Sequence, residues 1–467
     1  MAQIISSGIG SGLDITGLVS QLVQAERGPA ENRLNTSEVR AQSRLSAFGS
    51  LKSALSSFQS SLDKLQSEGL YQARKASVSD KDLFTVSSET TASAGNYTIQ
   101  SEQLASRHKI ASAAYADDDA SVGTGTLNIT VNGDTLALTI DAAGDSLTEI
   151  RDAINEAPAN PGVTASIIRD EDGSHLVFSA TETGAANTVT VSVTTDVSDT
   201  GNLAALTFDP LADPQTSPMA EKQAAVDAML VIDGFTAFSS NNVFDEVLEG
   251  VSITLKDSDP GNVHTLDVSR DESSVKKSIQ QFVDAYNSLR STIDTLTAYN
   301  AETGQAGLLQ GDSTTARLSA QLRQSLTLTI SGANRDLDTL AEIGISTNFE
   351  TGRLEIDNDT LDSLVTSNFG DFSALFAGDS GFAAQLDSVA DVYSRFDGIL
   401  DTRSNGINAQ IDRINSQRDA LNTRMVSVEA RYLAQFTALD GLLGELNQTS
   451  NFLTTQLGNL PTFNQEK

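Results

Sequence analysis

The stretch INAQIDRINSQRDALNTRMVSVEARY, residues 407–432, places an apolar residue at alternating steps of four and three positions. This spacing is typical of a coiled coil, in which one narrow stripe of each helix faces its partner. Arg418 is the one interruption, and the stripe resumes after Tyr432. A second step of four, from Tyr432 to Phe436, is a stutter that locally unwinds a left-handed supercoil. The predicted seam consists of Ile407, Ile411, Ile414, Leu421, Met425, Val428, Tyr432 and Phe436, and it continues through Leu439, Leu443, Leu446, Leu453 and Leu457.

A second, looser heptad pattern lies near the other end of the chain. It begins at Leu34 and ends at Leu65, and we expect it to pair with the middle of the C-terminal helix. Gly28-Pro29 predicts a break between this long helix and a shorter one that begins after Asp14. The candidate seam residues in the N-terminal helix are Leu45, Phe48, Leu55 and Leu62.

Composition limits the function classes. The chain has 467 residues, which predicts two to four domains, and its net charge of −32 argues against nucleic-acid binding. It has no cysteine, which excludes disulfides and thiolate chemistry. No apolar run approaches the ~18 residues of a membrane span, and the start of the sequence lacks the pattern of a signal peptide.

The charge is concentrated in the middle of the chain. Residues 117–215 hold 17 acidic residues and only two basic ones, whereas residues 398–467 hold seven acidic and six basic residues. The helical ends are therefore nearly neutral and free to pack, while repulsion keeps the middle soluble.

The middle of the chain changes to the alternating pattern of β-strands. Asn132-Gly133 lies between two alternating runs, which is the strongest short-range signal of a hairpin. Ser146 and Glu149 form a capping box that predicts a short helix, and Asp172-Gly173 predicts a second hairpin. The sequence therefore predicts a multidomain α+β fold, in which long antiparallel coiled-coil helices from both termini carry nested, inserted β-rich domains.

The predicted domain boundaries follow these changes of pattern. Residues 1–75 are predicted to form an N-terminal arm and the first helices of the helical domain. Residues 398–467 are predicted to form the C-terminal coiled-coil helix and a terminal arm. A returning helical segment occupies 271–397. The inner β-rich domain is predicted from 76–116 and 216–270, with an outer β-rich domain inserted at 117–215.

No set of residues predicts an enzyme, a cofactor or a metal site. The three histidines, His108, His175 and His264, lie in different segments without the spacing of metal ligands. Asp170-Glu171-Asp172-Gly173 resembles the start of a calcium loop but lacks the distal glutamate. Gly8-x-Gly10-x-Gly12 lacks both the final glycine and the preceding strand of a dinucleotide site. We therefore predict no catalytic, cofactor-binding or metal-binding residues.

Several motifs resemble those of the flagellar filament cap family, also called hook-associated protein 2. The opening motif runs from Ser6 to Asp14 and is followed by Leu18-Val-Ser-Gln-Leu-Val23. The resemblance covers nearly the whole chain. Further blocks are Gly95-Asn-Tyr-Thr-Ile99, Gln103-Leu-Ala105, Ile232-Asp-Gly234, Gly250-Val-Ser-Ile-Thr-Leu255, Phe282-Val-Asp-Ala-Tyr-Asn287 and Gln435-Phe-Thr-Ala-Leu-Asp440. The hairpin unit at Asn132-Gly133 also resembles the insertion motif of flagellins and hook proteins.

This resemblance implies a secreted structural protein at the distal tip of the bacterial flagellum. It implies export through the flagellar type III apparatus, with an export chaperone as an earlier partner. It also implies a ring-shaped homo-oligomer, with a pentamer as the expected form, although the sequence alone does not fix the subunit number. The ring would retain flagellin and promote its folding and polymerisation, and it would meet the hook–filament junction proteins.

The resemblance also implies where the contacts lie. The helical ends would be legs that reach the filament, and plate contacts between subunits would involve 103–109 and 229–255. Two alternatives remain open: another flagellar axial protein, such as flagellin or a junction protein, and a surface adhesin that uses the acidic outer domain. The expected filament or oligomer contacts are Ile4, Ile9, Leu13, Ile15, Leu18, Leu22, Leu446, Phe452, Leu453 and Leu457.

Overall fold

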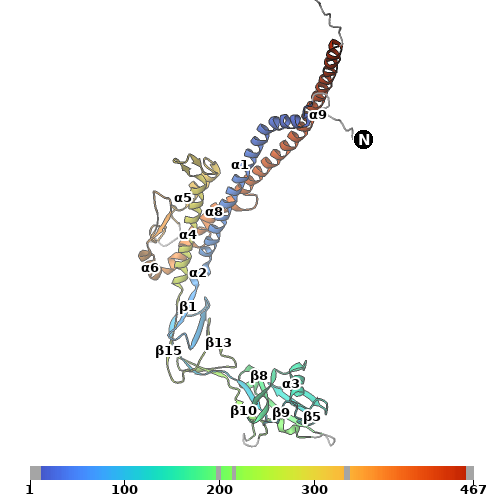
Figure 1. Cartoon of the computed structure of the whole chain (residues 1–467). Helices are drawn as coiled ribbons and strands as arrows, with labels where there is room; N and C mark the ends of the chain where they lie inside the picture. Colours follow the sequence, from blue (N-terminus) through green and yellow to red (C-terminus); the bar gives the residue numbers. More distant parts are fainter. Residues whose placement is uncertain (1–11, 196–200, 213–216, 331–336, 459–467) are drawn as a thin grey trace, which may run out of the picture. The chain divides into compact units, whose positions relative to one another are not determined.

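The chain folds into two compact units. The computed structural model describes residues 12–195, 201–212, 217–330 and 337–458 (Figure 1). The first unit combines the N-terminal residues to Leu70 with those from Glu272 onward, and the second comprises Tyr71–Asp271. The first is largely helical and the second largely antiparallel sheet, which confirms the predicted multidomain α+β class.

Helix α1 (Ile15–Gln66) begins at Asp14, whose carboxylate accepts a hydrogen bond from the Gly17 N–H at 2.9 Å. It continues through Pro29, so the predicted break at Gly28-Pro29 is wrong. Proline removes one backbone donor and favours a bend, and Figure 1 shows α1 bending in its N-terminal part. Contacts with the C-terminal helix on both sides of Pro29, through Arg27 and Glu38, hold the helix together across this position.

Helix α9 (Ile399–Gly458) runs antiparallel to α1, as predicted (Figure 1). Lys52 of α1 pairs with Asp401, and Arg27 donates to the Asn422 side chain at 2.8 Å. The later residue of α1 therefore meets the earlier residue of α9, as in an antiparallel pair. Within the predicted seam Ile407, Ile414, Met425 and Val428 are buried, whereas Ile411, Leu421, Tyr432 and Phe436 are half-buried.

Arg418, which interrupts the seam in the sequence, is accommodated by polar partners on α1. Its guanidinium donates to the Asn35 side chain at 2.9 Å and also pairs with Glu38. The hydrogen bond that Arg418 donates to the Glu38 carboxylate raises the pKa of Arg418 above its ordinary value. A charged residue therefore lies in the coiled coil with polar partners on the facing helix, which favours one register of the two helices.

The C-terminal half of α1 belongs to a helical bundle rather than to the coiled coil. Leu55 and Leu62 are buried there, but α1 packs in this half on α4 (Glu272–Thr297) and α8 (Phe382–Ser394). The Phe58 ring lies 6.0 Å from those of Phe282 and Tyr286 between centroids. The expectation that the whole α1 seam pairs with α9 is wrong, because α9 begins level with Lys52 and does not reach further along α1.

The other elements of the first unit surround this bundle. Asp312 caps α5 by accepting the Thr314 N–H at 2.9 Å, and its side chain is only 5% exposed. It lies 3.7 Å from both Arg44 of α1 and Arg403 of α9, so one buried carboxylate links three helices. The elements around the bundle are α5 (Ser313–Ser325), α6 (Asn358–Ser367) and α7 (Phe369–Phe376), with the hairpins β16 (Tyr299–Asn300)–β17 (Gln305–Ala306) and β18 (Ile345–Thr347)–β19 (Leu354–Ile356).

The second unit contains two separate hydrophobic cores. The first lies between two antiparallel sheets and includes Phe84, Ile99, Leu230 and Ile253, all almost fully buried. The five-stranded sheet has the order β1 (Arg74–Val78), β15 (His264–Arg270), β3 (Gly95–Gln103), β11 (Ala228–Ile232) and β12 (Phe235–Ser239). The other has the order β13 (Val243–Leu248), β14 (Val251–Leu255) and β2 (Phe84–Ser88), and the short helix α2 (Glu68–Gln72) precedes β1.

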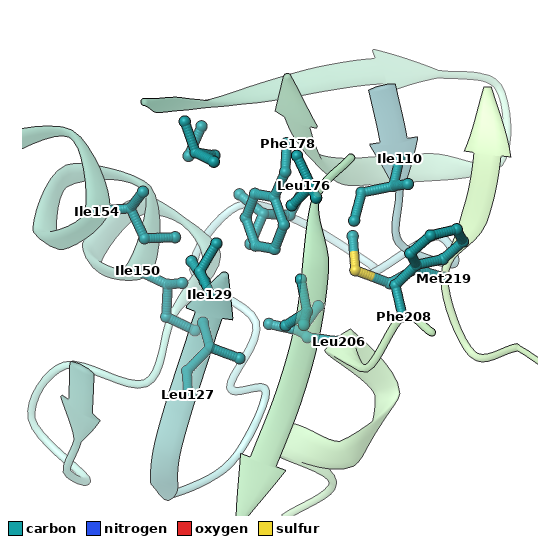
Figure 2. Packing of buried hydrophobic residues seen from close by; sticks show 14 of the residues in the cluster. Ile110, Leu127, Ile129, Ile150, Ile154, Leu176, Phe178, Leu206, Phe208 and Met219 are labelled. Atoms are coloured by element: carbon teal, nitrogen blue, oxygen red, sulfur yellow. The ribbon is translucent and has the colours of Figure 1, made fainter. Parts of the chain in front are cut away.

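The second core lies between a four-stranded and a three-stranded sheet, with α3 (Leu147–Glu156) packed against it. Figure 2 shows Ile150 and Ile154 of α3 on one side of this cluster, with Leu127, Ile129, Leu176 and Phe178 from the strands. The sheets are β10 (Ala220–Gln223)–β4 (Arg107–Ala111)–β8 (Gly173–Thr183)–β7 (Val163–Asp170) and β6 (Asp134–Ile140)–β5 (Gly125–Val131)–β9 (Thr190–Thr194); the 3-10 turns are η1 (Ala185–Asn187) and η2 (Leu203–Leu206).

The local predictions for this part are confirmed. Asn132 and Gly133 both have positive φ, 50° and 88°, as the tight hairpin between β5 and β6 requires. Ser146 and Glu149 form the predicted capping box at the start of α3. The core also contains Ile110 and Met219, which lie outside the predicted inserted segment 117–215. The predicted domain boundaries themselves stay a prediction.

The histidines of the second unit differ in their hydrogen bonds. Nδ1 of buried His108 accepts the Val189 N–H at 3.1 Å, and Nε2 lies 3.1 Å from Glu221. Burial lowers the pKa of His108, against an opposing effect of Glu221. His175 instead has Nδ1 2.9 Å from the Ser112 carbonyl and Nε2 beside Asp170, so both nitrogens face acceptors. The Ser112 carbonyl is the main cause that raises the pKa of His175.

These shifts predict opposite effects of pH on stability. Lowering the pH through the unfolded pKa of ~6.5 is expected to remove stability at His108, whose folded pKa is lower than this. His175 is expected to contribute stability below that pH and to lose it as the pH rises through its raised folded pKa. The chain has only three histidines, so their imidazole signals can be assigned one by one in an NMR titration. This titration measures the pKa values of His108 and His175 in the folded chain. The assignment would be wrong if His108 titrated above His175.

Candidate assembly surface

The end of α9 carries an apolar stripe whose leucines stay exposed to solvent among the described residues. Leu446 is 63% exposed, Leu453 52% and Leu457 65%, and no residue from Gly441 to Gly458 is buried. These leucines continue the heptad spacing of the coiled coil. Figure 1 shows α9, drawn in red, running on beyond the end of α1. We call residues 441–458 the α9 tail.

The register of the two helices explains why the tail is bare. Tyr432 Oη donates to Glu26 at 3.2 Å, and Arg27 bonds to Asn422. From there α1 has only about three turns left before Ile15, so it reaches α9 to roughly residue 440 and no further. A seam that continues for two heptads beyond its partner is an exposed apolar surface of the kind that marks an assembly interface.

The start of α1 and the residue Leu13 just before it add exposed leucines near the N-terminal end of the described chain. Leu13 is 48% exposed, Leu18 39% and Leu22 41%. Ile15, however, is 2% exposed and Val19 1%, and the place of Ile15 among the filament or oligomer contacts stays a prediction. Phe452 of the tail is 62% exposed. Ile4 and Ile9 lie outside the described residues.

The tail is nearly uncharged in a strongly acidic chain. From Gly441 to Gly458 Glu445 is the only charged residue. Docking of the tail therefore desolvates a single charged group while removing large leucine and phenylalanine side chains from water. Such a surface is suited to binding another helix.

Comparison with known proteins identifies the family. A model described as flagellar hook-associated protein 2 C-terminus matches residues 225–448, and the corresponding N-terminus model matches 11–108. An A-type flagellar hook-associated protein 2 of Pseudomonas aeruginosa is 36% identical, with 97% of each chain covered. The chain belongs to the flagellar hook-associated protein 2 family. Another member of this family, from Escherichia coli K12, is 33% identical over 98% of this chain and 99% of its own.

The fold agrees with this family. The crystal structure of the D1-D2-D3 domains of the flagellar cap protein FliD from Escherichia coli has a TM-score of 0.62 and 32% identity. It covers 78% of this chain and 99% of that one. A flagellin hook IN motif matches residues 126–182, which contain the Asn132-Gly133 hairpin and α3.

Among the described residues no three histidine, aspartate or glutamate side chains are grouped so as to hold a metal ion. No helix in the same ranges is long and apolar enough to cross a membrane.

Sequence reasoning missed some exposed apolar residues. Leu442 is 58% exposed and lies beside the predicted stripe. Phe349 is fully exposed at the tip of the β18–β19 hairpin, in a turn closed by the Gly352 N–H and the Asn348 carbonyl at 2.7 Å. The turn residues around Phe349 could have predicted its exposure from the sequence. The exposure of Leu442 could not be predicted in this way, because it depends on where α1 ends.

Proposed function

We propose that this protein caps the distal end of the bacterial flagellar filament. It retains exported flagellin and promotes its folding and polymerisation, so that the filament elongates. The observation that carries this proposal is family membership over nearly the whole chain, including both helical ends. No bond is made or broken in this role, since the mechanism is binding and confinement.

In this proposal the long helices α1 and α9 act as the leg that meets the filament. The bare stripe of the α9 tail, with Leu13, Leu18 and Leu22, supplies apolar contacts for helices of the growing end. Release needs only that the apolar contacts be exchanged for those with the next subunit, because no buried ion pair holds the tail. This explains how a cap can stay attached and yet move as subunits are added.

The proposal includes several partners. Copies of the chain form a ring, with a pentamer as the expected form, and contacts through 103–109 and 229–255 hold its plate together. Flagellin and the hook–filament junction proteins are the partners at the filament, and an export chaperone binds before secretion. The place of action is extracellular, at the filament tip.

The alternatives have less support. A flagellin or a junction protein would share helical ends and the motif at 126–182, but the matches at both ends are to hook-associated protein 2. The adhesin alternative rests only on the acidity of the second unit, and no observation on the described residues favours it.

Deleting the gene tests the proposal. We expect the cells to release monomeric flagellin into the medium and to build no long filaments, because nothing retains the exported subunits. Electron microscopy and immunoblotting of the medium measure both effects. Restoring the gene on a plasmid is the control, and normal filaments in the deletion strain would show that the proposal is wrong.

A further inference from the structure

A polar pocket lies between the end of α1 and the N-terminal part of α4, both in the helical unit. It has a volume of ≈ 370 Å³. Of the described residues that line it, Leu70 alone is apolar and none is an aspartate or a glutamate. We call it the lysine pocket. Its other lining residues are Lys64, Ser67, Ser274, Lys277, Ser278 and Gln281.

Two ammonium groups make the lysine pocket positively charged. The chain has ten lysines and a net charge of −32, so two lysines in one pocket without a carboxylate are an unusual concentration. Lys64 Nζ donates to the Gln281 side chain at 3.0 Å, which holds the ammonium at the pocket and leaves it two further donors. Lys277 is exposed, and within the ranges that the structure describes neither lysine forms an ion pair. An anion that enters the pocket therefore meets two positive charges that no ion pair neutralises.

Ser278 gives a second and independent indication of a ligand. Its surface is only 7% exposed, and its hydroxyl has no hydrogen-bond partner among the described residues. Buried polar groups in proteins are nearly always hydrogen-bonded, because one that is left without a partner is destabilising. Ser274, Ser278 and Gln281 are four and three residues apart, so they lie on one face of α4, towards the pocket. The Ser278 hydroxyl is therefore placed to donate to a molecule in the lysine pocket.

The groups in the lysine pocket favour an acceptor with negative charge. An ammonium group only donates hydrogen bonds, and its bonds to a charged oxygen are short and strong. A phosphate group presents oxygens in several directions, so it can accept from Lys64, Lys277 and Ser278 together, and lysine is a common point-charge contact for phosphate. Acidic residues elsewhere on the chain repel an anion, but salt screens charges beyond ~8 Å at physiological ionic strength. The lining of the pocket therefore decides its preference.

We propose that the lysine pocket binds a phosphate group, either free inorganic phosphate or the phosphate of a monoester. Lys64 and Lys277 are the charged contacts, and Ser278 donates a further hydrogen bond. The bound group contacts the end of α1 and the start of α4, so it stabilises the helical unit more as its concentration rises. This site goes beyond the proposed function and does not depend on it.

Isothermal titration calorimetry of the full chain with inorganic phosphate, at constant ionic strength, tests the site. We expect Lys277→Gln to weaken phosphate binding about tenfold, because a charge-assisted hydrogen bond is lost. Lys276→Gln is the matched control, since Lys276 is the neighbouring lysine of α4 but pairs with Asp362 at 2.9 Å and does not line the pocket. Its phosphate affinity is expected to stay within about twofold of that of the unaltered chain. Equal losses in both variants, or no saturable binding by the unaltered chain, would overturn the proposal.

Ser278→Ala separates a ligand contact from a structural role. The hydroxyl has no partner among the described residues, so its removal is expected to leave the thermal midpoint without phosphate unchanged or slightly raised, since alanine favours a helix. Phosphate affinity is expected to fall about fivefold, because one hydrogen bond to the ligand is lost. A lower midpoint with unchanged affinity would show that the hydroxyl serves only the fold, and it would overturn the proposal.

A titration with glycerol 3-phosphate distinguishes the two sources of the phosphate group. Tighter binding of this monoester than of inorganic phosphate would assign the pocket to an ester, and tighter binding of the inorganic ion would assign it to free phosphate. Failure of both to bind would overturn the proposal. These measurements use purified chain, so normal filaments in the deletion strain would refute the cap function and leave this result unchanged.

Discussion

Replacing Leu446 and Leu453 with glutamate is expected to abolish filament growth while leaving the chain folded. Both side chains are more than half exposed, so they contribute little to folding, and exposed substitutions usually change stability by less than about 0.5 kcal/mol. On docking, each leucine is expected to contribute about 1.5–3 kcal/mol, and a carboxylate in its place adds a desolvation cost. The loss of affinity is therefore expected to exceed about a thousandfold.

The measurement is complementation of a deletion strain with the double variant. Filament length by electron microscopy and flagellin in the medium report function, and thermal unfolding of the purified chain reports stability. The matched control replaces Val39 and Val426 with glutamate, because these are exposed apolar residues of the same two helices outside the tail. Filaments of normal length with the Leu446 and Leu453 variant would show that the tail does not contact the filament.

The elements that the sequence predicts well are those whose pattern is local. The Asn132-Gly133 hairpin requires only that these two residues adopt positive φ angles. The capping box requires only the side chains and backbone N–H groups of Ser146 and Glu149. The heptad pattern at the C-terminus likewise predicts α9, because the spacing of apolar residues along a single helix is visible in the sequence alone. These features require no knowledge of the rest of the chain.

The features that were missed depend on tertiary contacts. Pro29 reads as a break in isolation, but contacts with α9 on either side of it keep α1 continuous. Leu55 and Leu62 fit a heptad, yet they pack in the bundle because α9 starts too late to meet them.

Replacing Phe58 with alanine is expected to give the largest loss of stability in the helical unit. Its side chain is fully buried where α1, α4 and α8 meet, with Phe282 and Tyr286 each 6.0 Å away between ring centroids. Removing a buried phenylalanine ring costs about 3–5 kcal/mol, since the neighbours cannot fill the cavity. Domain stabilities are about 5–15 kcal/mol, so this change alone removes a large part of the total.

Urea unfolding followed by circular dichroism measures this effect. Phe349→Ala is the matched control, because it removes the same ring from a fully exposed position and is expected to change stability by less than about 0.5 kcal/mol. A loss below about 1 kcal/mol for Phe58→Ala would contradict the packing of Phe58 on Phe282 and Tyr286. Since the second unit has cores of its own, it is expected to keep its unfolding midpoint. The helical signal of Phe58→Ala should therefore be lost at lower urea than that of the sheets, because the bundle, rather than the coiled coil alone, sets the stability of the helical unit.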